Sequence, residues 1–177
     1  MKNIFNILLC VLILFIFSSC SKKENKTTEK DIKTEKPAFT TGFYCLMDGK
    51  EWFLPDSISY IGKSNKEFNI YALKGDYTSD APYEDFFIYI NTPLNVGEFP
   101  LAAENNPSHV QFNSNLTLKE KKSKDDYDAF WSKSGKLTVT KITGDRAEGT
   151  FEFTLKTSDD PPKTIKITEG KFNLKIH

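Results

Sequence analysis

The fold is decided by the C-terminal third of the chain, where residues 135–176 read GKLTVTKITGDRAEGTFEFTLKTSDDPPKTIKITEGKFNLKI. Apolar and polar residues alternate at Leu137 and Val139, again over residues 151–156, and a third time over residues 165–176. A period of two sends successive side chains to opposite faces, which is the pattern of a half-buried β-strand. This stretch therefore predicts several strands that turn one face toward a core.

Turn-forming residues separate these runs. Residues 143–145, TGD, follow the first run. Residues 158–162, SDDPP, must form a loop, because two adjacent prolines cannot donate the hydrogen bonds of a central strand. We expect residues 165–176 to divide into a closing pair of strands around Glu169-Gly170.

The preceding part of the chain extends the same pattern toward the N-terminus. Residues 41–54 predict a hairpin, because Asp48-Gly49 supplies the two positive-φ residues of a type I′ turn. Residues 68–74, FNIYALK, and 86–91, FFIYIN, are apolar on both alternating sets, so we expect central strands covered on both faces. About nine or ten short strands with frequent turns predict an all-β domain, a single antiparallel sandwich or flattened barrel over residues 39–177.

The N-terminus has the features of a secretory signal. A lysine near the start is followed by the apolar residues 4–17, interrupted by Asn6, and then by two serines and Cys20. The apolar run of 14 residues is short for a transmembrane helix, which needs about 20, so a permanent transmembrane anchor is the weaker alternative.

Residues 17–20, FSSC, resemble the lipobox of bacterial lipoproteins, with Phe17 where that motif usually has leucine. The resemblance implies that residues 1–19 are a lipoprotein signal peptide, removed before Cys20. It further implies a diacylglycerol on the Cys20 sulfur and an acyl chain on its amino group. We expect these chains to anchor the protein to a membrane.

A charged segment follows the cysteine. Within residues 20–38, the stretch SKKENKTTEKDIKTEKP contains one apolar residue, Ile32, and such a composition predicts a flexible tether. Surface-exported lipoproteins of Bacteroidota resemble one another in an acidic cluster just after the cysteine. Because this chain has Lys22 and Lys23 there, we expect the periplasmic face of the outer membrane rather than the cell surface.

Three further segments resemble small Bacteroidota lipoproteins of a family of unknown function. They are CLMDGKEW with its DG-x-x-W hairpin, EGTFEF with G-T-F-x-F, and ITEGKF near the end. The resemblance implies an all-β fold and a periplasmic or surface location, and it implies no activity. Gly149 and Gly170 each stand two residues before a phenylalanine, where we expect a bulge or a close backbone approach.

The amino-acid composition excludes some classes of binding partner. Lys and Arg total 24, as do Asp and Glu, so the chain lacks the basic excess that indicates nucleic-acid binding. Of three cysteines, Cys10 lies in the predicted signal and Cys20 is expected to carry lipid. Cys45 is therefore expected to be a buried, unpaired thiol.

Catalytic and metal-binding motifs are not found. The two histidines, His109 and His177, belong to no metalloprotease, nucleophile or phosphate-loop motif, so we expect neither catalytic residues, metal nor cofactor. Residues 125–128, DDYD, lack the spacing of a calcium loop, and a solvated loop is expected there with a calcium site as the alternative.

Two surface features are candidates for recognition. Tyr127, Phe130 and Trp131 beside the acidic run could stack on sugars or other apolar ring faces, or Phe130 and Trp131 could cover an open end of the barrel. Residues 56–58, DSI, resemble the three-residue O-glycosylation motif of exported Bacteroidota proteins, which makes Ser57 a candidate acceptor.

Together these features lead us to expect a membrane-anchored lipoprotein whose β domain binds a ligand or partner without catalysis. A glycan or an envelope protein is the expected partner, besides the membrane itself. The alternatives are a structural or assembly accessory of the envelope and a glycan-acting enzyme whose carboxylates cannot be paired from sequence.

Overall fold

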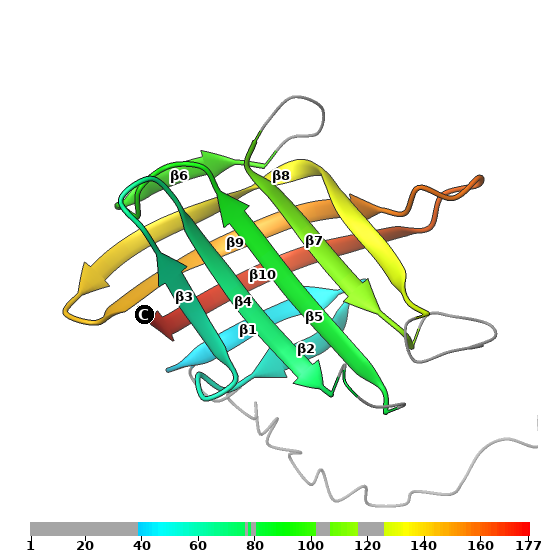
Figure 1. Ribbon diagram of the computed structural model, residues 1–177, viewed down its shortest axis with the longest axis horizontal. Coiled ribbons are helices and arrows are strands. Elements are labelled where there is room, and N and C mark those ends of the chain that lie inside the picture. The colour runs from blue at the N-terminus through cyan, green and yellow to red at the C-terminus, as the bar shows by residue number, and fades with distance from the viewer. Residues whose placement is uncertain (1–38, 77, 79–80, 102–106, 117–125) are drawn as a thin grey trace, which may run out of the picture. The chain divides into compact units, whose positions relative to one another are not determined.

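The computed structural model describes residues 39–76, 78, 81–101, 107–116 and 126–177 (Figure 1). The predicted signal peptide, Cys20 and the tether lie outside the described residues. Within those residues, no helix has the length and apolar character needed to span a membrane.

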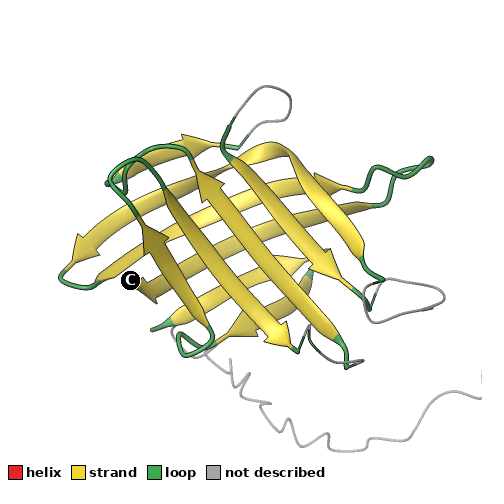
Figure 2. Ribbon diagram, viewed as in Figure 1, coloured by secondary structure: helices red, strands yellow, loops and turns green. Residues whose placement is uncertain are grey.

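The regular secondary structure of the described chain consists of strands (Figure 2). They are β1 (Gly42–Met47), β2 (Lys50–Leu54), β3 (Ser59–Lys63), β4 (Phe68–Gly75), β5 (Tyr83–Ile90), β6 (Gly97–Pro100), β7 (His109–Ser114), β8 (Asp128–Thr143), β9 (Arg146–Lys156) and β10 (Thr164–Lys175). This confirms the prediction of an all-β domain with about nine or ten strands.

The strands form one antiparallel sheet folded into two layers. Their order is β2-β1-β10-β9-β8-β7-β5-β4-β3, and β6 pairs with β8 away from this path. In Figure 1, β3, β4, β5 and β7 lie in front of β1, β2, β9 and β10. We call β3, β4, β5, β7 and the start of β8 the front sheet. The remaining strands, with the end of β8, form the back sheet.

Strand β8 connects the two layers. Its first residues, Asp128 to Trp131, pair with β7, whereas residues 136–139 pair with β6. The pairing with β9 is irregular between Ser132 and Ser134, near the bend of the strand seen in Figure 1. A bulge in a long strand permits this change of direction without breaking the sheet.

The residues after β10 connect that strand to β3, which lies at one end of the strand order. Ile176 forms a parallel bridge with Ile61 of β3. The His177 amide donates to the Ile61 carbonyl at 2.8 Å, and the Lys63 amide donates to the His177 carbonyl at 3.3 Å. The expected sandwich or flattened barrel is thus confirmed, and it is closed along this side by backbone hydrogen bonds.

Aromatic rings fill the interior between the layers. Phe43 of β1 stacks on Phe151 of β9 with centroids 4.6 Å apart, and it lies 5.5 Å from Phe86 of β5. Phe86 in turn lies 4.6 Å from Phe112 of β7. Burial of these large rings supplies much of the driving force for folding. Cys45 is buried in the same core, as expected.

Two predicted turns have different outcomes. The Asp48-Gly49 hairpin is confirmed, with φ values of 48° and 79° between β1 and β2. The expected closing pair around Glu169-Gly170 is wrong, because β10 is one strand that carries a bulge there. Glu169 has a φ of 52°, and this local kink absorbs the extra residue without a chain reversal.

The expected close approach at the two glycines is confirmed. A Cβ on Gly170 would lie 2.3 Å from Phe151 Cδ2, and a Cβ on Gly149 would lie 2.0 Å from the Thr138 carbonyl oxygen. Both positions therefore exclude any side chain.

The expectation that β4 and β5 are covered on both faces is wrong. Phe86, Ile88 and Ile90 point into the core, while Phe87 and Tyr89 on the other face remain half-buried. An antiparallel sheet commonly packs one face on the core and turns the other to solvent.

Candidate functional site

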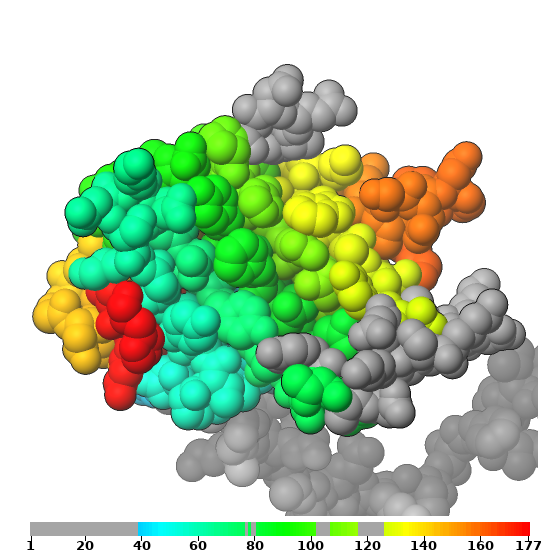
Figure 3. Space-filling view, viewed as in Figure 1, coloured from blue at the N-terminus to red at the C-terminus, as the bar shows by residue number. Residues whose placement is uncertain are grey.

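The outer face of the front sheet carries ring side chains on every one of its strands. We call these the aromatic face: Tyr60 of β3, Tyr71 of β4, Phe87 and Tyr89 of β5, His109 of β7 and Trp131 of β8. Phe87, Tyr89 and Tyr71 are half-buried, whereas Tyr60 and Trp131 are 41% and 39% exposed. Figure 3 views the molecule from the side of the front sheet.

Strand register places several of these side chains in one row. Tyr60 is paired with Tyr71, and Tyr71 with Phe87. Phe87 is paired with Gln111, and Gln111 with Trp131. Neighbouring strands lie about 4.8 Å apart, so the four steps from the first residue to the last span about 19 Å. The row crosses the strands at right angles to their length.

Several of the rings contact one another. Tyr60 and Tyr71 have centroids 5.7 Å apart. The His109 ring lies 5.4 Å from Tyr89, 6.4 Å from Phe87 and 5.8 Å from Trp131. Rings held by such contacts lose little conformational freedom when a ligand covers them, which favours binding.

Hydrogen-bonding side chains lie among the rings. Gln111 Nε2 donates to Asn113 Oδ1 at 2.9 Å, and the Tyr89 hydroxyl donates to Glu67. Asp85 is paired with Asn113 on the same face. Burial raises the pKa of the Asp85 carboxyl, while hydrogen bonds from Asn113 act in the opposite direction. The face thus combines flat apolar rings with amide and hydroxyl groups.

The outer face of the back sheet has a different composition. A shallow groove over β8, β9 and β10 is lined there by Thr138, Thr150, Glu152 and Lys171, among others. Alternating threonine and charged residues are typical of a solvated strand face. Rings are fewer on this face: over β1 and β2 it carries Tyr44, which contacts Phe39 at 6.4 Å, and Phe53, which is 51% exposed.

The three residues of the predicted patch, Tyr127, Phe130 and Trp131, lie in different environments. Trp131 belongs to the aromatic face. Phe130 is 1% exposed and packs against Phe112 in the core, so its assignment to a surface patch is wrong. Tyr127 is 46% exposed, and among the described residues its ring contact is with Tyr83 at 6.4 Å.

The remaining members of the face were not identified from sequence. One alternating set of FNIYALK holds Asn69 and Tyr71, and one set of FFIYIN holds Phe87 and Tyr89. In each of these strands the outward-facing set mixes aromatic with polar residues, whereas the inward-facing set contains isoleucine. This difference in composition is the signal that distinguishes the outer face from a core face.

A row of polar side chains occupies one end of the interior. Register aligns Glu84, Ser114 and Asp128 on inward-facing positions of β5, β7 and β8. Glu84 Oε2 accepts a hydrogen bond from Trp52 Nε1 at 2.7 Å, and Asp128 Oδ2 lies 2.5 Å from Lys163 Nζ. Asp128 was expected in a solvated loop and is instead buried in the sheet. Both carboxylates have partners that give them a structural role.

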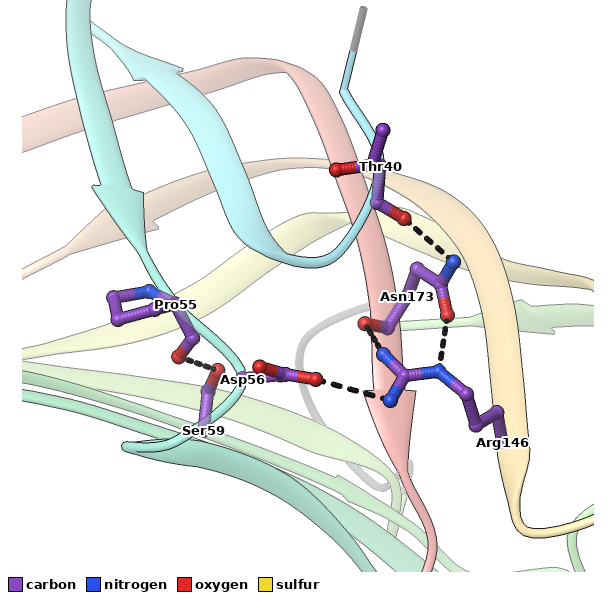
Figure 4. Close-up of polar contacts among 6 residues, drawn as sticks. All are labelled: Thr40, Pro55, Asp56, Ser59, Arg146 and Asn173. Atoms are coloured by element: carbon purple, nitrogen blue, oxygen red, sulfur yellow. Dashed lines mark hydrogen bonds and ion pairs between the residues drawn. The ribbon is translucent and has the colours of Figure 1, made fainter.

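Ser57 lies exposed in the turn between β2 and β3. The preceding residue, Asp56, is held by Arg146, whose Nη1 lies 3.0 Å from Asp56 Oδ2 (Figure 4). Arg146 also donates through Nε to Asn173 Oδ1 at 2.9 Å. Accessibility suits a modified serine, and O-glycosylation of Ser57 stays a prediction.

Within the described part of the chain, no group of three or more histidine, cysteine or acidic side chains could hold a metal ion. No protein-family model matches the chain, and no curated protein or solved structure is significantly similar to it.

Proposed function

We propose that the chain is a membrane-anchored lipoprotein whose β domain binds a ligand without catalysis, and that the aromatic face is the binding surface. The observation that carries this proposal is the presence of ring side chains on the outer face of every strand of the front sheet, four of them in one row. The part of the back sheet's outer face over β8, β9 and β10 provides the internal comparison, since threonine and charged residues line it there.

Physical chemistry supports a binding role for such a surface. Large contiguous apolar patches on a protein surface are uncommon and mark interaction sites. Tyrosine and tryptophan offer a wide apolar surface with few rotatable bonds and a polar tip, so they bind at low entropic cost. Mutual ring contacts at His109 restrict these side chains further.

The binding role is tested by paired variants. Tyr71→Ala and Trp131→Ala remove rings from the face, and Thr138→Ala with Thr150→Ala serve as controls on the back sheet. A panel of soluble polysaccharides, peptidoglycan fragments and lipid vesicles should include ligands whose binding is weakened by the first pair alone. If every ligand binds the two pairs of variants equally, the face is not the binding surface.

Anchoring through Cys20 is tested separately. Cys20→Ser should abolish metabolic labelling of the chain with palmitate and release it from the membrane fraction. Persistent labelling of this variant would contradict the lipid assignment, without bearing on the binding surface.

A further inference from the structure

We propose that the ligand of the aromatic face is a neutral, extended glycan chain that lies across the strands, along the row from Tyr60 to Trp131. This inference rests on the proposed function, that the face binds a ligand, and adds the ligand's chemical class and its orientation. Four features of the face support it: the type of side chain, the charge, the direction of the row and the twist of the sheet.

The side chains match the two surfaces of a sugar ring. The face of a pyranose ring presents C–H groups, which pack favourably against the electron-rich face of an aromatic ring. The rim of the sugar presents hydroxyl groups, each both a donor and an acceptor. Gln111 and Asn113 carry amides with the same dual capacity. Gln111 lies between Phe87 and Trp131 in the row, and Asn113, to which it donates a hydrogen bond, lies beside the row between Asp85 and Ala129.

The charge of the row favours a neutral ligand. Tyr60, Tyr71, Phe87, Gln111 and Trp131 carry no charge at neutral pH. Anionic glycans, nucleic acids and acidic membranes are bound by clustered lysine and arginine, which these five positions do not supply.

Charged groups border the row instead. Glu67 accepts a hydrogen bond from Tyr89, and Asp85 is hydrogen-bonded to Asn113. Lys156 is paired with Trp131, where the row ends. The charges near the face thus have mixed sign and do not favour a ligand of either charge.

The direction and twist of the row favour an extended single chain. Its span of about 19 Å allows a linear glycan to contact several rings at once. Neighbouring strands are rotated by roughly 20–25°, so successive rings are tilted relative to one another along the row. A twisted polymer in solution can follow this tilt, whereas a flat crystalline surface would contact few of the rings.

The test measures binding of the full chain in a zwitterionic detergent that has no sugar headgroup. Ladders of neutral oligosaccharides with several linkages are titrated by calorimetry, beside oligogalacturonates as anionic counterparts. For a bound neutral glycan, affinity should rise with chain length and level off once the glycan spans the row. Tyr71→Ala and Phe87→Ala should each weaken binding about tenfold, as expected for loss of one stacking contact. Thr150→Ala should bind as the wild type does.

Tryptophan fluorescence reports the position of the ligand. The chain has two tryptophans, of which Trp52 is buried and Trp131 exposed. Trp131→Phe should retain most of the affinity, because a ring remains to stack, and should lose the fluorescence change on binding. A fluorescence change that persists in Trp131→Phe would contradict contact with this end of the row.

The outcomes separate this inference from the proposed function. If the face variants weaken binding of anionic glycans, vesicles or a second copy of the chain while no neutral glycan binds, the glycan class is wrong and the binding face stands. An affinity independent of glycan length overturns the orientation along the row. If the face variants alter the binding of no ligand, both proposals fail.

Discussion

Arg146 Nη1 lies 3.0 Å from Asp56 Oδ2, which joins the start of β9 to the turn between β2 and β3 across 90 residues of sequence. The two side chains are only 26% and 29% exposed. Arg146 also donates to the side-chain and backbone oxygens of Asn173 in β10, at 2.9 and 2.7 Å. One guanidinium therefore holds three segments together, as Figure 4 shows.

Arg146→Lys should destabilise the domain by about 1–3 kcal/mol, because an ammonium group cannot replace the planar fork that satisfies several acceptors at once. The measurement is the free energy of unfolding in urea. Lys141→Ala is the control, since the Lys141–Glu148 pair is much more exposed and should not affect the unfolding midpoint. Equal midpoints for both variants would mean that Arg146 has no structural role.

Gly170→Ala should destabilise the domain by about 3 kcal/mol or more, because the new Cβ would lie 2.3 Å from Phe151 Cδ2 and 2.4 Å from its carbonyl oxygen. Neither the backbone nor this buried ring can move away without disturbing the core. Gly144→Asn is the matched control in a turn with φ of 60° and open space around it, which asparagine tolerates. Thermal unfolding compares the two, and a wild-type melting temperature for Gly170→Ala would contradict the close approach.

The Cys45 thiol should be inert in the folded protein. Burial, and secondarily the negative charge of Glu84, raise its pKa to about 12 from the ordinary value of 9.0. In a chain with Cys10→Ser and Cys20→Ser, Cys45 should react with a thiol reagent at pH 8 only after unfolding. Rapid modification under native conditions would show that the core opens locally around this residue.

The same pKa shift predicts a loss of stability at alkaline pH. The unfolded chain releases the thiol proton above pH 9.0, while the folded chain retains it up to about 12. The contribution of Cys45 is therefore fully present below pH 9 and falls by about 1.4 kcal/mol for each pH unit above it. The difference in unfolding free energy between wild type and Cys45→Ala isolates this slope from other groups that titrate there. A difference independent of pH from 8 to 11 would be inconsistent with the shift.

Removal of Ile176 and His177 should loosen β3, because it deletes the backbone hydrogen bonds that His177 makes with Ile61 and Lys63. Hydrogen exchange of the β3 amides should become faster, since that strand would keep only its pairing with β4. The amides of β9, which pair on both sides, provide the internal reference. Unchanged exchange in β3 would show that the C-terminal closure adds no protection.

Much of the fold follows from local pattern. The alternation of apolar and polar residues over 151–156 determines a strand, and the Asp48-Gly49 turn determines a hairpin. Both depend on short-range chemistry, and both are present as predicted. The bulge at Glu169-Gly170 was mistaken for a chain reversal, because residues with positive φ occur in bulges and in turns alike. Only the pairing with β9 shows that β10 continues through this point.

The aromatic face could not be derived in the same way. Alternation divides Phe86 from Phe87 and Ile88 from Tyr89, and only the polar residues within one set, such as Asn69 beside Tyr71, indicate which set faces solvent. The row depends on register between strands far apart in sequence, which long-range packing determines. Phe130 and Trp131 could have been separated beforehand, because adjacent residues of a strand point to opposite faces and cannot share one patch.

The carbonyl of Thr40, at the entry to β1, accepts a hydrogen bond from Asn173 Nδ2 at 2.7 Å. This is where the predicted tether would transmit mechanical force to the domain when a bound ligand is dragged away from the membrane. Since β1 is hydrogen-bonded to β2 on one side and β10 on the other, a pull along its axis loads both ladders in shear rather than peeling them one bond at a time. A force applied through the predicted tether should therefore meet more resistance than one that peels a single edge strand from the sheet.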